Sequence, residues 1–95
     1  MKNIIMYSVS GCSRCGAFEM IFAERNIQYK KINDPEALLN FADDHAIATI
    51  PVFDVDGVPM DYLSVLNILG VSEKRFEEIQ ETLDRWSAMW YFYVG

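Results

Sequence analysis

This sequence has little cysteine, histidine or positive charge, and it has no long apolar run. It carries two cysteines and one histidine in 95 residues, fewer than the several cysteine pairs that hold small secreted proteins together. No apolar run approaches the roughly 20 residues that a membrane-spanning helix needs. With 8 Lys and Arg against 14 Asp and Glu, the formal net charge is −6. Because phosphate backbones and anionic lipid surfaces repel an acidic chain, we expect no nucleic acid and no membrane as a partner.

The composition favours one folded domain. Hydrophobic residues make up 52% of the chain, a share typical of globular proteins rather than disordered ones. A chain of this length is the size of a single domain. Residues 3–7 are apolar but polar residues follow at once, so we expect no secretory leader. We therefore expect a cytoplasmic protein in a reducing compartment.

The N-terminal third predicts a strand, a helix and a second strand. Apolar side chains in residues 3–9 fall on both faces, which is typical of a strand covered on both sides. Residues 13–25 have helical spacing, with Phe18 and Phe22 four residues apart. Residues 27–32 predict the second strand. Because a β-α-β unit nearly always crosses over with a right hand, the two strands should be parallel.

The middle of the chain predicts a second helix and then a hairpin. Asp34 supplies an N-cap oxygen and Pro35 suits the first helical turn. Segments 50–55 and 58–60 are rich in β-formers and flank an Asp-Gly pair at 56–57, which is a hairpin signal.

Four strands and a further short helix complete the predicted domain. Pro59 has no backbone N–H, so its strand should lie at the edge of the sheet. Residues 61–69 predict a short helix that Gly70 ends. The order β-α-β-α-β-β-α, followed by one additional helix, predicts an α/β fold with a four-stranded mixed sheet and helices on both faces.

The last quarter predicts a longer amphipathic helix that Ser72 caps. Its apolar residues are spaced by three and four; they are Phe76, Ile79, Leu83, Trp86 and Trp90. We divide the chain into a domain at 1–70 and a C-terminal segment at 71–95. That segment ends in an aromatic tail, which either packs on the domain or docks on a partner.

Cys12 and Cys15 stand where the first strand ends and the first helix begins. Residues i and i+3 share one helical face about 5–6 Å apart, and a modest adjustment brings them to disulfide distance. The positive end of the helix dipole, with Arg14 nearby, favours a thiolate at Cys12. Cys15 lies deeper in the helix and should be shielded. The pair thus predicts a nucleophilic Cys12 and a resolving Cys15.

Three other interpretations of the cysteine pair remain open. A purely structural disulfide that closes so short a loop stabilises the fold by on the order of 2 kcal/mol, against about 3 kcal/mol for a loop of about 15 residues. Zinc normally takes four ligands, and His45 is the remaining nitrogen candidate, so we expect no metal. Two inert buried thiols are the third. The β-α-β context favours redox chemistry over all three.

Two segments of the chain resemble glutaredoxins. Residues 7–15 resemble the family's tyrosine-to-CxxC segment, and residues 49–53 resemble its Thr-Val-Pro segment. The similarity covers residues 2–69 and leaves the last quarter unmatched. It implies the thioredoxin-like fold.

The resemblance implies a role for each matched residue. Cys12 is then the exposed nucleophile and Cys15 the resolving thiol, with Tyr7 packed beside the active site. Pro51 is in the cis form and places the Ile50 backbone to pair with the substrate's main chain. Because only about 5–6% of X–Pro bonds are cis, this expectation depends on the resemblance.

The sequence departs from the family pattern at several positions. Val9 stands where many members have a lysine for a glutathione carboxylate. The family's Gly-Gly pair after the hairpin is missing, and Asp61 and Tyr62 fall near its place. We assign Asp61 and Arg14 to substrate binding. Ser13 replaces the usual proline, and some members with serine there hold an iron–sulfur cluster between two subunits, with glutathione as co-ligand.

The resemblance implies a dithiol thiol–disulfide oxidoreductase that reduces protein or glutathione mixed disulfides, in electron transport and cell redox homeostasis. The glutaredoxin family includes proteins that donate electrons to ribonucleotide reductase. We expect a monomer without a bound cofactor, which takes electrons from glutathione or from a flavoprotein reductase. The alternative is a non-catalytic binding module that docks on a larger protein through its aromatic C-terminal helix.

Overall fold

Eight regular elements make up the described part of the chain. The structure, a computed structural model, describes residues 2–94, and side chains for residues 2–85. In chain order the elements are β1 (Ile4–Ser8), α1 (Ser13–Glu24), β2 (Lys30–Asn33), α2 (Pro35–Asp44), β3 (Val52–Val55), β4 (Val58–Met60), α3 (Tyr62–Leu69) and α4 (Glu73–Val94). The described residues thus form a small α/β protein, with the four-stranded mixed sheet and four helices that the sequence predicts.

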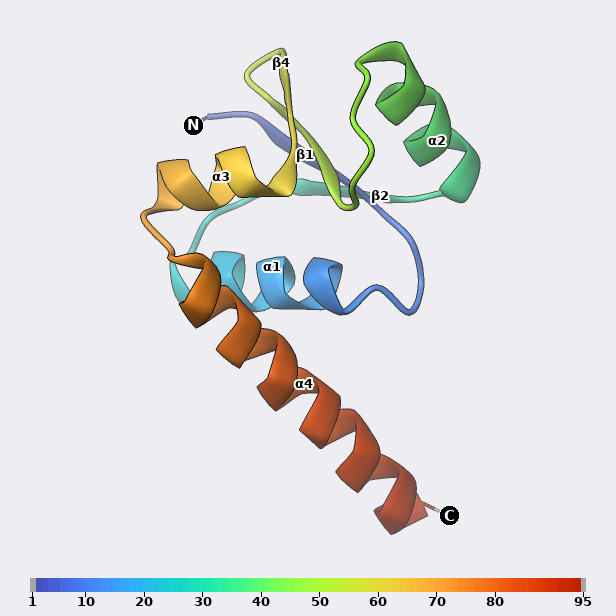
Figure 1. Cartoon of the computed structure of the whole chain (residues 1–95), viewed down its shortest axis with the longest axis vertical. Coiled ribbons are helices and arrows are strands. Elements are labelled where there is room, and N and C mark those ends of the chain that lie inside the picture. The colour runs from blue at the N-terminus through green and yellow to red at the C-terminus, as the bar shows by residue number, and fades with distance from the viewer. Residues whose placement is uncertain (1, 95) are drawn as a thin grey trace.

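The sheet has the strand order β2-β1-β3-β4 (Figure 1). β1 runs parallel to β2 and antiparallel to β3, and β3 and β4 form an antiparallel hairpin. Asp56 and Gly57 turn the hairpin with φ of 52° and 85°, the positive values that a two-residue type I′ loop needs. Pro59 lies in β4, at the edge of the sheet. The parallel pair, the hairpin and the edge position of Pro59 are confirmed.

Helices cover both faces of the sheet. α1, α3 and the first turns of α4 share one hydrophobic core with the sheet, and its buried rings are Phe18, Phe22, Phe53 and Phe76. α2 lies on the other side (Figure 1), where Leu38 and Ala42 pack against Val52. The central strand β1 is therefore covered on both sides, as its apolar pattern predicts.

Side-chain oxygens begin the helices where the sequence predicts them. Asp34 Oδ1 accepts from the backbone N–H of Glu36 at 3.0 Å, and Pro35 occupies the first helical position of α2. Ser72 Oγ accepts from the backbone N–H of Arg75 at 3.1 Å. Each cap satisfies an N–H that the first turn of a helix leaves without a partner.

Helices α1, α2 and α3 end in one common motif. The residues after them, Asn26, Ala46 and Gly70, have φ of 56°, 55° and 71°. The next backbone N–H groups, of Ile27, Ile47 and Val71, donate to the carbonyls of Phe22, Ala42 and Leu66 at 2.8, 2.9 and 3.0 Å. This is the Schellman motif. It explains why β2 begins at residue 30 and not at the predicted residue 27: Ile27 closes α1.

α4 begins in the core and then leaves it. Phe76 and Ile79 are buried, and Leu83 is half-buried against the same core. Figure 1 shows α4 passing α1 and extending away from the sheet. Trp86 and Trp90 belong to the predicted stripe, but their side chains and those of the aromatic tail lie outside the described residues. The division of the chain at residue 70 stays a prediction. Within the described residues, no helix combines the length and apolar character that crossing a membrane requires.

Candidate functional site

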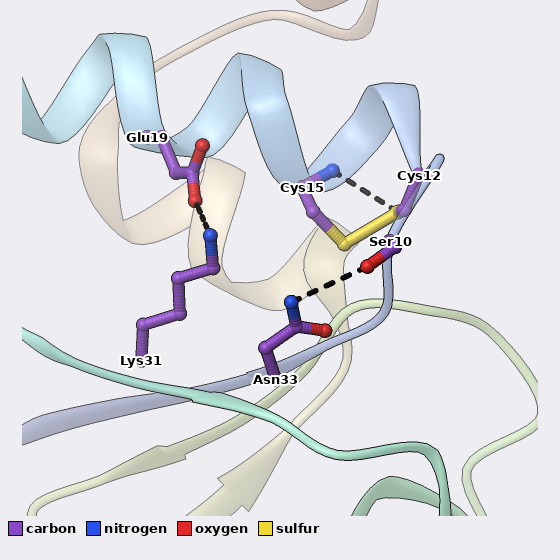
Figure 2. Close-up of polar contacts among 6 residues, drawn as sticks. All are labelled: Ser10, Cys12, Cys15, Glu19, Lys31 and Asn33. Atoms are coloured by element: carbon purple, nitrogen blue, oxygen red, sulfur yellow. Dashed lines mark hydrogen bonds and ion pairs between the residues drawn. A yellow bond between two sulfur atoms is a disulfide. The ribbon is translucent and has the colours of Figure 1, made fainter.

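The two cysteines form a disulfide at the N-terminus of α1. Cys12 is the N-cap residue, and Cys15 is the third residue of the helix, with their Cα atoms 5.3 Å apart. The backbone N–H of Cys15 donates to Cys12 Sγ at 3.2 Å (Figure 2). Cys15 is 4% exposed, whereas Cys12 is half-buried. The pair therefore has one accessible sulfur and one shielded sulfur, and the helix N-terminus faces the accessible one.

The loop between β1 and α1 holds this helix start against the sheet. Gly11 has φ of 79°, a left-handed conformation that glycine adopts without penalty. Asn33 Nδ2, at the end of β2, donates to Ser10 Oγ at 3.4 Å beside the disulfide (Figure 2). Further along α1, Glu19 pairs with Lys31 of β2 at 2.5 Å, and this hydrogen bond raises the pKa of Lys31.

Arg14 joins three segments of the chain at the site. Its Nη1 donates to the carbonyl oxygen of Ile50 at 3.4 Å. Its Cζ lies 4.4 Å from the centroid of the Tyr62 ring, a distance at which a cation and an aromatic face attract. The first turn of α1, the turn before β3 and the first turn of α3 therefore meet at one side chain.

The turn before β3 has the backbone form that the glutaredoxin resemblance implies. The Ile50–Pro51 peptide bond is cis, and Pro51 is buried while Ile50 is half-buried. The pairing of the Ile50 backbone with a substrate stays a prediction. Arg14 already contacts the Ile50 carbonyl, so the structure brings two of the predicted site residues together.

Tyr7 and Asp61 have structural contacts of their own. The Tyr7 ring stacks on Phe41 of α2 with the centroids 4.5 Å apart, so this side chain packs with the core on the α2 face. Asp61 Oδ1 accepts from the backbone N–H of Ser64 at 2.8 Å and caps α3. Their predicted roles toward a substrate stay predictions.

Residues of α4 lie at the border of the site, and the sequence did not indicate them as site residues. Gln80 Nε2 donates to Ser13 Oγ, within the Cys-x-x-Cys segment, at 3.4 Å. A cavity beside Ser13 is lined by that residue together with Glu77, Gln80, Glu81 and Asp84. Their spacing of three and four residues along α4 marks a common polar face. Nothing in the sequence indicates that this face lies next to the cysteines.

The described residues contain no group of three or more His, Cys, Asp or Glu side chains arranged to hold a metal ion. His45, the nitrogen ligand considered for a zinc site, lies at the end of α2, with its ring 4.6 Å from that of Phe41.

No protein-family model and no curated protein matches this chain. The resemblance to glutaredoxins therefore depends on the quoted segments and on the geometry of the cysteine pair.

Proposed function

We propose that the protein is a dithiol thiol–disulfide oxidoreductase with a thioredoxin-like fold, in which Cys12 is the nucleophile and Cys15 the resolving thiol. The observation that carries the proposal is the Cys12–Cys15 disulfide at the N-terminus of α1. The backbone N–H that donates to Cys12 Sγ and the helix dipole both favour a sulfur anion there once the disulfide is reduced. Because Cys12 is only half-buried, its sulfur can reach a substrate disulfide and can itself be reached by Cys15.

The arrangement of the strands supports the thioredoxin-like assignment. The cysteine pair follows the central strand β1, which is parallel to β2, while β3 and β4 form an antiparallel hairpin. A cis X–Pro bond precedes β3. The glutaredoxin resemblance implies this same combination of features.

The proposed reaction transfers two electrons and two protons in two exchanges. The Cys12 thiolate attacks one sulfur of a substrate disulfide, the substrate S–S bond breaks, and the first thiolate leaves and takes a proton from water. Cys15 then gives up its proton and attacks Cys12 Sγ, which releases the second substrate thiolate to be protonated. The substrate disulfide is reduced, and the enzyme dithiol is oxidised to the Cys12–Cys15 disulfide. An external dithiol regenerates the enzyme by the same exchange in reverse.

The charges around the site favour a protein disulfide over glutathione. Glu77, Glu81 and Asp84 line the cavity beside Ser13, and the whole chain has a net charge of −6. Glutathione carries two carboxylates and one ammonium group, so like charges repel it from this wall. We therefore propose a protein substrate, a flavoprotein reductase as the source of electrons and no bound cofactor.

Substitution of each cysteine tests the proposal. Cys12→Ser removes the nucleophile, and reduction of insulin disulfides by dithiothreitol with this variant should fall to the uncatalysed rate. Cys15→Ser keeps the first exchange, so it should accumulate a mixed disulfide with the substrate that mass spectrometry detects. Ser64→Ala, a change at an exposed position of α3, is the control and should retain activity. Wild-type activity in Cys12→Ser would rule out the proposed nucleophile.

The alternative of a non-catalytic binding module depends on the aromatic residues after residue 85. Their side chains lie outside the described part of the chain, and this alternative stays a prediction.

A further inference from the structure

Ser8 is a buried hydroxyl without a hydrogen-bond partner. It is the last residue of β1 and is 0% exposed. Within the described residues, no group lies in hydrogen-bonding position to its Oγ. A buried polar group left without a partner costs about 1–3 kcal/mol, and such groups are rare enough that each one needs an explanation.

The alternation of β1 places Ser8 on the face that α1 covers. Buried and half-buried residues alternate along the strand, and the buried ones are Ile4, Met6 and Ser8. Ile4 and Met6 belong to the core that β1 shares with α1. Because side chains two residues apart in a strand share one face, Ser8 faces α1 as well.

The same geometry places Ser8 level with the first turn of α1. The helix runs back along β1, and its sheet-facing residues include Phe22, Phe18 and Cys15, all buried. The rings of Phe18 and Phe53 lie with their centroids 4.7 Å apart, and Phe53 pairs with Met6 in the sheet, so Phe18 is level with Met6. Cys15 lies about one helical turn before Phe18, and Ser8 lies two residues beyond Met6 along the strand. The buried residue of α1 at the level of Ser8 is therefore Cys15.

We propose that the Ser8 hydroxyl is the hydrogen-bond donor to Cys15 Sγ in the reduced protein. In the oxidised protein Cys15 Sγ is bonded to Cys12 Sγ and is an uncharged, weak acceptor. Reduction breaks this S–S bond with two electrons and leaves Cys15 as a thiol whose sulfur is free to accept a hydrogen bond. In the resolving step this thiol gives up its proton, and the resulting thiolate is a strong acceptor. Ser8 is thus a positioning residue, and this inference rests on the redox cycle proposed above.

The buried position of Cys15 makes such a donor necessary. At 4% exposure the sulfur is shielded from water, and burial disfavours its charged form. A hydroxyl poised on the same face supplies the missing donor. Because the hydrogen bond forms only after reduction, it stabilises the reduced protein relative to the oxidised one.

The equilibrium with glutathione, used only as a probe, tests this inference. For Ser8→Ala, the equilibrium constant for reduction of the protein disulfide should fall about tenfold, which is about 30 mV toward a more negative potential. The matched control is Ser64→Ala, an exposed serine in α3, and it should shift the constant less than twofold. A purely structural role for Ser8 would destabilise both redox states alike and leave the potential in place. An unchanged potential in Ser8→Ala overturns the inference.

A measurement on the unaltered protein covers the case in which Ser8→Ala does not fold. A crystal structure of the reduced wild-type protein should show Ser8 Oγ within hydrogen-bond distance of Cys15 Sγ. An ordered water bonded to the hydroxyl in both redox states would overturn the inference instead.

The potential is measured without turnover, so the two proposals fail separately. If the potential shifts in Ser8→Ala but the wild-type protein reduces no substrate, the proposed function is ruled out and the Ser8–Cys15 hydrogen bond is supported. An active wild-type protein whose potential does not respond to Ser8→Ala would do the reverse.

Discussion

Arg14, which lies between the two cysteines, contacts two other segments of the site. Its guanidinium touches the Ile50 carbonyl and the Tyr62 ring. The guanidinium of Arg14 adds a positive charge in the first turn of α1. One side chain thus orders three segments and favours a thiolate at Cys12.

Arg14→Met should make Cys12 a weaker nucleophile. Methionine keeps an unbranched apolar stem but removes the charge and the hydrogen bond, so the pKa of the Cys12 thiol should rise. Because a partly exposed charge pair is worth about 0.6 kcal/mol, we expect alkylation of the reduced protein at neutral pH to slow about threefold. Iodoacetamide kinetics and the ultraviolet absorbance of the thiolate across pH measure this.

Arg25→Met is the matched control for the Arg14 substitution. Arg25 lies at the opposite end of α1, where its Nη1 donates to the Leu69 carbonyl at 2.6 Å. It should leave the alkylation rate unchanged. Equal rates in Arg14→Met and the wild type would contradict the role given to Arg14.

Local residues of the site could be predicted from the sequence, and residues from distant elements could not. The cysteine pair is visible because its spacing and its place at a strand-to-helix junction are both local properties. The contact of Arg14 with Tyr62 depends on how α3 packs beside α1. The Gln80–Ser13 hydrogen bond depends in the same way on α4.

At the scale of elements, the helix starts and the ends of α1 and α3 were predictable, and the end of α2 was not. Asp34 and Ser72 are side-chain caps, which a sequence displays directly. Gly70 marks the end of α3 because glycine favours the left-handed conformation. Asn26 and Ala46 adopt that conformation too, but alanine carries no signal for it. The predicted start of β2 was early because Ile27, directly after Asn26, closes α1 through its hydrogen bond to the Phe22 carbonyl.

Ala46→Gly should stabilise the protein. Ala46 has φ of 55°, a left-handed conformation that costs a residue with a Cβ about 1–2 kcal/mol. Glycine removes this strain but increases the entropy of the unfolded chain, so we expect a net gain of about 0.5–1 kcal/mol. Urea unfolding of the oxidised protein measures the change.

Ala37→Gly is the companion substitution with the opposite expected sign. Ala37 lies in the first turn of α2, where glycine costs about 1 kcal/mol. If both substitutions destabilise the protein by similar amounts, the proposed strain at Ala46 is absent.

At the scale of the whole molecule, part of the acidic charge lies beside the cysteine pair, because Glu77, Glu81 and Asp84 line the cavity next to Ser13. The net charge of −6 and its consequences for partners follow from composition alone. The stripe of apolar residues predicts that α4 is amphipathic, but it does not specify the surface on which α4 packs. Because Phe76 and Ile79 enter the core that α1 shares, the acidic face of α4 comes to lie beside Ser13.

The protein should prefer disulfides flanked by positive charge. Two peptides with the same disulfide, one flanked by lysines and one by aspartates, test this preference. At low salt we expect kcat/KM to be several-fold higher for the lysine-flanked peptide. The ratio should shrink as ionic strength passes about 0.1 M, where the screening length is about 10 Å.

Paired charge removals locate the origin of that preference. The double variant Glu77→Gln, Glu81→Gln should lower the ratio of kcat/KM for the lysine-flanked peptide to kcat/KM for the aspartate-flanked one. The matched double variant Asp43→Asn, Asp44→Asn removes the same charge from the exposed end of α2 and should leave it unchanged. Equal effects of the two would mean that net charge alone sets the preference.

The carboxylate of Asp56, at the tip of the β3–β4 hairpin, accepts from the backbone N–H of Lys2 at 3.1 Å and of Asn3 at 2.7 Å. These hydrogen bonds lower the pKa of Asp56, the Asn3 bond most. They fasten residues 2–3 to the hairpin. These residues directly precede the end of β1 opposite Ser8, and about 13 Å of strand lies between the two ends. A tether or affinity label joined before Lys2 would therefore emerge on the far side from the disulfide, so an immobilised protein would present its sulfur atoms outward, toward the solution.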